Sequence, residues 1–281
     1  MKIKLLIILL SLFGLFLQGC ATIQPEAGSY ITNTYNDDGS IKSIKETKDG
    51  NEIGTLYFEY YPSGEIKHHM QYVNDILNGE SMAYFESGKV YALATYKNGV
   101  QDGKFIDYFD NGEIKKAGFY SNDKLDGVVD TYDSEGSIIS REEYKDGIKA
   151  WEWEYDNKIN ISIKQFHENG NVHIRFDIKN EMVHGLYDQY YKNGNIEIST
   201  SYINGNKSGI QRQFYEEGNL DWEVWFKDEK ITEAKQYYQG GNLAKEIDFK
   251  DGKAIKGFQY TYDGVKTKMT NAHFLNSGFE Y

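Results

Sequence analysis

Few residues of this 281-residue chain have the types and spacing that catalysis or metal binding requires. The adjacent His68 and His69 would point to opposite faces of a strand and could not share a metal ion. His167 and His173 flank one expected turn, where opposed strands could bring them together as a zinc pair. The stretch from Gly99 to Lys104 is similar to a phosphate loop, but it is one residue short and lacks Ser or Thr after the lysine. Turn chemistry explains it better.

The motifs of the common hydrolase and redox sites are missing from the sequence. There is no Gly-x-Ser-x-Gly, no His-Glu-x-x-His and no Cys-x-x-Cys. Acidic turns such as Asn36-Asp37-Asp38-Gly39 lack the spacing of a calcium-binding loop. We therefore predict a protein that is not an enzyme, with no metal site and no cofactor.

The N-terminus reads as a targeting segment. Lys2 and Lys4 precede an apolar run from residue 5 to residue 17, which is too short to span a bilayer of about 30 Å comfortably. The run ends in Leu17-Gln18-Gly19-Cys20, which resembles a bacterial lipobox. We predict a signal peptide over residues 1–19, acylation (palmitate) of Cys20 and a lipidated tether over residues 20–32. The membrane would be the outer membrane in a cell with two membranes, and otherwise the outer side of the plasma membrane.

The charge and the composition of the chain narrow the expected class of partner and the expected class of fold. The formal net charge is −12, and no basic patch with interleaved aromatics occurs, so nucleic acid is not an expected partner. The chain has 24 Tyr, 15 Phe and 28 Gly but only 2 Pro. Aromatic residues favour strands and glycines favour turns, which predicts an all-β protein of many short strands.

A repeat of about 24 residues organises the chain from residue 33 onward. Each repeat has a turn glycine, an aromatic residue four positions before it, and usually an aliphatic residue two positions after it. An Asp or Asn ten positions after it begins a second turn, often with glycine next (Gly99, Gly205), and we expect a further glycine to close that turn (Gly79, Gly103, Gly127, Gly185, Gly209). Each repeat is then a β-hairpin, because the side chains in the segments between these turns alternate between two faces, as in β-strands. The first-turn glycines are Gly39, Gly64, Gly88, Gly112, Gly136, Gly170, Gly194, Gly218, Gly241 and Gly264.

This pattern resembles the MORN repeat, in the bacterial variant found in YwqK-type antitoxin-like proteins. Tyr96-Lys97-Asn98-Gly99 with Gly103, and Tyr202-Ile203-Asn204-Gly205 with Gly209, carry the resemblance. It implies an elongated antiparallel meander of 9–10 repeats and a protein partner such as a toxin or effector. We divide the array into a first block (33–150), an irregular long hairpin (151–165) and a second block (166–281).

The tryptophans and a set of glutamines distinguish this chain from the general repeat pattern. Tryptophan is rarely used for turn spacing, so we predict partner-binding roles for Trp151, Trp153, Tyr155, Trp222 and Trp225. The second block repeats a glutamine five positions before each turn glycine, two strands apart, so we expect no direct pairing between them (Gln165, Gln189, Gln213, Gln236, Gln259). We expect a lipid-anchored protein-interaction scaffold with an antitoxin-like or immunity-like role. The alternative is a module that binds cell-wall glycan or another carbohydrate.

Overall fold

The computed structural model describes residues 29–156 and 160–270. Over this part of the chain it contains 22 β-strands and no helix, so the all-β prediction is confirmed. In the same residues there is no helix long and apolar enough to cross a membrane. The predicted signal peptide, the lipidation site Cys20 and the C-terminal residues 271–281 lie outside the described residues. The chain divides into two compact units, Met1–Gly112 and Glu113–Tyr281.

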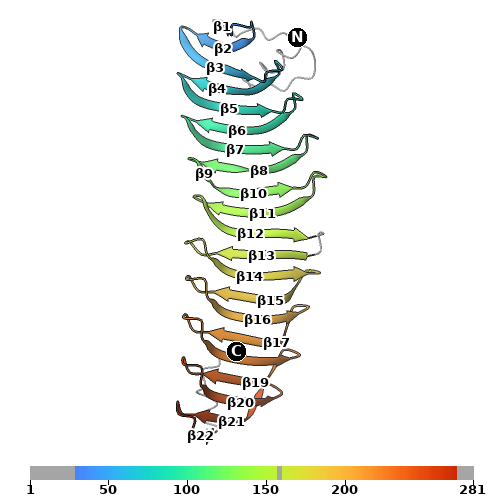
Figure 1. Ribbon diagram of the computed structural model, residues 1–281, viewed down its shortest axis with the longest axis vertical. Coiled ribbons are helices and arrows are strands. Elements are labelled where there is room, and N and C mark those ends of the chain that lie inside the picture. The colour runs from blue at the N-terminus through green and yellow to red at the C-terminus, as the bar shows by residue number, and fades with distance from the viewer. Residues whose placement is uncertain (1–28, 157–159, 271–281) are drawn as a thin grey trace. The chain divides into compact units, whose positions relative to one another are not determined.

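The first unit is an antiparallel meander in which each strand pairs with the next along the chain (Figure 1). Its strands are β1 (Ser29–Tyr35), β2 (Ile41–Lys48), β3 (Asn51–Tyr60), β4 (Ile66–Val73), β5 (Ile76–Tyr84), β6 (Val90–Lys97) and β7 (Val100–Tyr108).

The second unit continues the same way, with a two-residue strand β9 beside β8 before β10 takes up the pairing (Figure 1). Its strands are β8 (Ile114–Ser121), β9 (Lys124–Leu125), β10 (Gly127–Tyr132), β11 (Ile138–Lys145), β12 (Ile148–Asp156), β13 (Asn160–Phe166), β14 (Val172–Lys179), β15 (Met182–Tyr190), β16 (Ile196–Ile203), β17 (Asn206–Phe214), β18 (Leu220–Lys227), β19 (Lys230–Tyr237), β20 (Leu243–Lys250), β21 (Lys253–Tyr260) and β22 (Lys266–Lys268).

Two kinds of turn alternate along each meander. At the first-turn glycine, for example Gly64 with φ +84°, the amide of Gly64 donates to the carbonyl of Tyr61 (2.9 Å), and the amide of Tyr61 donates to the carbonyl of Glu65 (2.8 Å). This is a type I turn closed by a glycine bulge. The second turn has only two residues, such as Asn98 and Gly99, both with positive φ, which is a type I′ turn. The structure thus has turns at both of these positions of the repeat.

The glycine expected to close the second turn has a different place. The two-residue turn is complete without it, and Gly103 lies inside β7, where the ladder with β6 skips between Ala94 and Tyr96. Its φ is +129°, and an added Cβ would lie 2.9 Å from the Cβ of Thr95. Gly103 therefore permits a β-bulge rather than a turn. The other glycines of this column also have positive φ (Gly79, Gly127, Gly185, Gly209).

The hydrophobic core consists of small clusters within each unit. In the first unit Ile44, Leu56 and Phe58 are buried together. In the second unit Val224, Ile231 and Ala234 form a similar cluster, against which Trp222 and Phe226 pack. Most other apolar side chains are only partly covered, so both faces of each sheet keep accessible surface.

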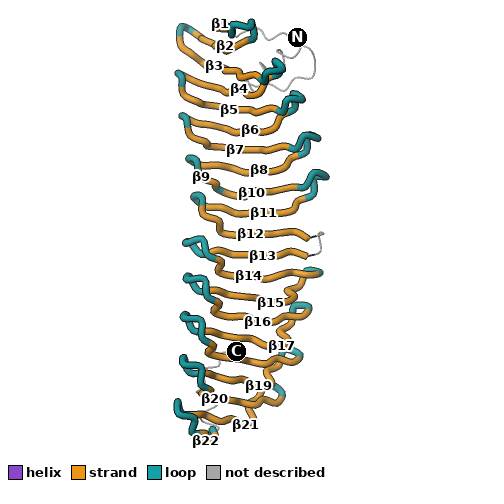
Figure 2. Tube along the Cα trace, in the orientation of Figure 1, coloured by secondary structure: helices purple, strands orange, loops and turns teal. Residues whose placement is uncertain are grey.

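The β12–β13 hairpin interchanges the two edges and the two faces of the repeat within the second unit. Successive turns of a meander lie at opposite edges, and this hairpin occupies the edge at which a glycine-bulge turn would otherwise lie. The glycine-bulge turns after β13 are consequently at the other edge from the one between β10 and β11 (Figure 2). Arg141 shares a face with Trp153, Ile163 and Phe176 through direct pairing. Arg141 is five residues after Gly136, whereas Phe176 is six residues after Gly170. Because side chains alternate along a strand, residues at the same place in the repeat lie on opposite faces before and after this hairpin.

Candidate binding face

One face of the second unit carries a continuous row of glutamine and aromatic side chains. Residues directly opposite one another on paired strands share a face, and the pairing links ten such residues from β12 to β21. All ten side chains are partly exposed. We call them the glutamine row: Trp151, Gln165, Ile174, Gln189, Ile198, Gln213, Trp222, Gln236, Lys245 and Gln259.

The glutamines of the row do not pair with each other, as expected from their spacing of two strands. Each lies between two non-glutamine neighbours. The side-chain amide of Gln189 donates to a carboxylate oxygen of Glu197 at 2.9 Å, and Gln236 approaches Asp221 at 3.5 Å. The row therefore presents amide groups at regular intervals on a half-exposed surface, with aromatic rings at Trp151 and Trp222.

Three of the predicted partner-binding residues form an aromatic strip along β12. Trp151, Trp153 and Tyr155 alternate on one face, and the rings of Trp151 and Trp153 are stacked with centroids 5.8 Å apart and planes 19° apart. Trp153 pairs with Ile163, which is 8% exposed. The strip thus has one buried apolar neighbour on its own face, and its rings remain partly open to solvent.

The remaining two predicted residues lie apart from this strip and from each other. Trp222 is on β18 on the same face as the strip, within the glutamine row. Trp225 is on the opposite face, where it pairs with Glu233 and the Nζ of Lys235 lies 4.7 Å from its ring centroid. Residues an odd number of positions apart on one strand point to opposite faces, so the separation of three between Trp222 and Trp225 was a signal for this in the sequence.

The opposite face is dominated by ion pairs between neighbouring strands. Lys164 contacts Glu152 (2.6 Å), Arg175 contacts Asp188 (2.8 Å) and Arg212 contacts Glu223 (3.0 Å), and further pairs extend the row in both directions. Asp188 is 2% exposed and also accepts from the hydroxyl of Ser199 at 2.6 Å. The hydrogen bond to Glu152 raises the pKa of Lys164. Charges on this face are therefore largely neutralised by one another.

A ladder of turn side chains connects successive repeats, and sequence reasoning missed it. The residue three positions before the turn glycine donates from its hydroxyl to a backbone carbonyl of the next repeat: Tyr191 to Phe214 (2.8 Å), Tyr215 to Tyr237 (2.9 Å), Tyr238 to Tyr260 (2.7 Å) and, in the first unit, Tyr61 to Tyr84 (2.7 Å). His167 takes the same place, with Nε2 2.9 Å from the carbonyl of Tyr190. The sequence carried a signal for this ladder, because several repeats have an aromatic residue three positions before the turn glycine, next to the aromatic residue four positions before it.

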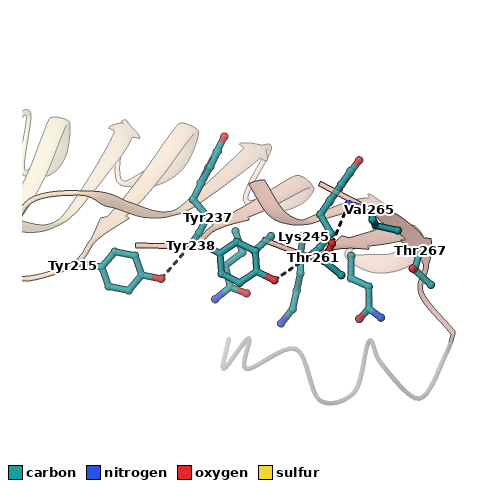
Figure 3. A pocket seen from close by; sticks show the side chains of 11 residues that line it. Tyr215, Tyr237, Tyr238, Lys245, Thr261, Val265 and Thr267 are labelled. Atoms are coloured by element: carbon teal, nitrogen blue, oxygen red, sulfur yellow. Dashed lines mark hydrogen bonds between the residues drawn. The ribbon is translucent and has the colours of Figure 1, made fainter. Parts of the chain in front are cut away.

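The glutamine row ends in a groove of about 440 Å³ between β17 and β22 (Figure 3). The rings of Tyr215 and Tyr238 and the side chain of Lys245 lie on its side of the sheet, whereas Tyr237 points to the other side. Gln236 and Gln259 also line it. Tyr237 donates to Glu223 at 2.9 Å on the opposite face, and burial raises its pKa to about 12.

The histidines show one contact that the sequence anticipated. The rings of His167 and His173 lie 4.2 Å apart across their turn, and burial lowers the pKa of His173. Among the described residues no group of three or more His, Cys, Asp or Glu side chains could hold a metal ion. His68 and His69 point to opposite faces: His68 contacts Glu59 (2.9 Å), and His69 is 2% exposed beside Tyr84.

Comparison with known proteins agrees with the repeat. No curated protein matches the chain. One solved structure that resembles it, a Tc holotoxin pore of Photorhabdus luminescens, is 11% identical, and the match covers 85% of this chain and 14% of that chain with a TM-score of 0.22. A likeness at that score has no bearing on function. Five stretches match the family model of the MORN repeat variant: residues 55–74, 77–98, 101–122, 183–204 and 232–251. The hairpins within these five stretches thus match the MORN repeat variant.

Proposed function

We propose that this protein is a non-enzymatic, lipid-anchored scaffold of the bacterial cell envelope that binds a protein partner through the aromatic strip of β12. Acylation of Cys20 would tether the sheet to the membrane, with two or three chains giving a stable anchor at about 0.8 kcal/mol per buried methylene. The lipobox-like sequence before Cys20 supports this tether.

The observation that carries the binding role is the difference between the two faces. The charges of the ion-pair face are paired with one another within the sheet, so that face has little net charge with which to attract a partner. The other face keeps two stacked tryptophan rings and a tyrosine partly exposed, with the buried Ile163 beside Trp153. Trp and Tyr side chains are typical of the residues that dominate binding energy in interfaces.

The resemblance to antitoxin-like proteins favours a toxin or effector as the partner. An immunity role at the envelope would reconcile an exported, anchored chain with such a partner. The net charge of −12 favours a partner with a basic surface around its apolar contact.

A photo-reactive phenylalanine analogue at Tyr155 tests the proposal in intact envelopes. We expect one protein adduct of defined mass, which disappears when Trp153 is replaced by Ala. The same analogue at Trp225, on the ion-pair face, is the matched control and should give no such adduct. Equal adducts from both positions, or none from Tyr155, would contradict a partner-binding strip.

A further inference from the structure

We infer that the groove between β17 and β22, together with the neighbouring glutamines, binds a linear, uncharged polysaccharide of the flat, chitin-like type. This goes beyond the proposed protein-binding strip, because it concerns other strands of the second unit and another class of ligand. The inference rests on the groove's lining, on the fixed orientation of its rings, on the interval between its amides and on its charge.

The lining combines the two groups that sugars need. Tyr215 and Tyr238 supply aromatic rings, against which the C–H face of a sugar ring can pack. Gln236, Gln259 and Thr267 supply donors and acceptors for hydroxyl groups, and Ala244 is a small buried residue beside them. The volume of about 440 Å³ is within the range of roughly 300–1,000 Å³ for ligand sites.

The rings are held in place before any ligand arrives. Tyr215 and Tyr238 each donate their hydroxyl to the backbone of the next repeat, at 2.9 and 2.7 Å, which fixes their side-chain rotamers. Asn219 and Asn242 bind carbonyls of the following turns at 3.0 and 3.1 Å and so fix the turns that carry the rings. A site that is ordered in advance loses less conformational entropy on binding.

The amide interval matches a ligand with a two-ring repeat. Gln213, Gln236 and Gln259 are two strands apart in the same row, which corresponds to about 9.5 Å at the usual strand spacing. In a flat glycan whose successive rings are turned over, every second ring presents the same hydroxyl edge, and the length of two rings is comparable to this interval. A helical glycan has no such match.

The charge of the site favours a neutral ligand. The row from Gln165 to Gln236 carries no ionic side chain, and Lys245 is a single cationic side chain in the lining, with its Nζ 5.9 Å from the centroid of the Trp222 ring. Asp221 lies beside Gln236, and the chain is acidic overall. A polyanion such as a nucleic acid or a phosphate-linked polymer would be repelled.

Calorimetric titration of the full-length protein in detergent micelles tests the inference, with chitohexaose as the probe and the helical maltohexaose as its comparison. We expect chitohexaose to bind and to bind more tightly than the dimer and tetramer of the same series, while maltohexaose gives no heat at millimolar concentration. Absence of binding by chitohexaose, or equal binding of both hexaoses, would overturn the inference.

Three variants locate the site. The double variant Gln236→Ala, Gln259→Ala removes two neutral hydrogen-bonding groups and should weaken chitohexaose about 30-fold. Gln239→Ala, in the adjacent turn but outside the lining, is the matched control and should stay within about twofold. If the double variant loses its β-sheet spectrum, Gln259→Ala alone should still weaken binding about fivefold. Unchanged affinity in a folded Gln259→Ala variant would refute the site.

The outcome is independent of the protein-binding proposal. Trp153→Ala should abolish the protein adduct and leave chitohexaose affinity unchanged, since Trp153 is on β12 and outside the groove. Failure of the titration with an intact adduct would refute only the glycan site, and the reverse result would refute only the protein-binding strip.

Discussion

The buried imidazole of His69 should make β3–β5 of the first unit sensitive to acid. His69 is 2% exposed, its ring lies beside those of Phe58 and Tyr84, and its Nδ1 is 2.9 Å from the hydroxyl oxygen of Tyr84. Burial lowers its pKa from 6.5 to about 4, against a smaller opposing influence of the Glu80 carboxylate. The folded state therefore holds a neutral imidazole throughout the mildly acidic range.

The sign and size of the effect follow from proton linkage. As the pH falls below 6.5 the unfolded chain binds a proton at this position and the folded chain does not, so stability declines between pH 6.5 and about pH 4. At pH 5 the expected loss is about 2 kcal/mol, and the full loss below both pKa values is about 3 kcal/mol. Above pH 6.5 the contribution of this group to the free energy of unfolding is constant.

Hydrogen exchange measured by mass spectrometry is the suitable assay, because all four tryptophans lie in the second unit and would not report on this region. After correction for intrinsic rates, peptides from β3–β5 should open about 30-fold more often at pH 5 than at pH 7.5. His69→Phe keeps an aromatic ring between Phe58 and Tyr84 and removes the titrating group, so most of this increase should vanish. An equal pH dependence in wild type and variant would refute the assignment to His69.

Three further predictions concern other parts of the chain. Labelled palmitate should enter the wild type and not Cys20→Ala, and equal labelling of both would exclude the anchor. Gly103→Ala should cost about 1–3 kcal/mol in the free energy of unfolding, because its φ is +129° and the new methyl would be 2.9 Å from a side chain of β6, whereas Gly54→Ala, in the same column without positive φ, should cost less than about 1 kcal/mol. Similar costs in urea titrations would contradict the bulge explanation. Tyr215→Phe should lower the free energy of unfolding by about 1 kcal/mol, because it removes the 2.9 Å hydrogen bond to the next repeat. An unchanged midpoint of urea unfolding would show that the ladder does not contribute to stability.

The repeat made much of the fold predictable. Glycine at the first turn and Asn or Asp at the second are required by their backbone angles, so the spacing of Gly64, Gly88 and Asn98 fixed where the strands end. The bulge at Gly103 was read as part of a turn, because a glycine near a turn and a glycine in a strand look alike in one sequence. Only the ladder register distinguishes them.

The site was less predictable because faces depend on register. The grouping of Trp222 with Trp225 overlooked their odd separation on one strand, which places them on opposite faces, whereas the position of Trp222 on the same face as Trp153 follows only from the pairing of the strands between them. The irregular hairpin of β12 and β13 was recognised from its alternating pattern, but its interchange of faces depends on the pairing of Trp153 with both Arg141 and Ile163. Long-range pairing of this kind is set by the sum of many strand contacts and not by any local signal.

Radical footprinting of the protein in its native envelope tests the scaffold account most directly. The tryptophans and the tyrosine can be compared between intact envelopes and purified protein by mass spectrometry. If the strip of β12 binds a partner, oxidation of Trp151, Trp153 and Tyr155 should fall in the envelope, while that of Trp225 on the ion-pair face stays unchanged. Equal protection of Trp225, or no protection of the other three, would contradict binding through the strip.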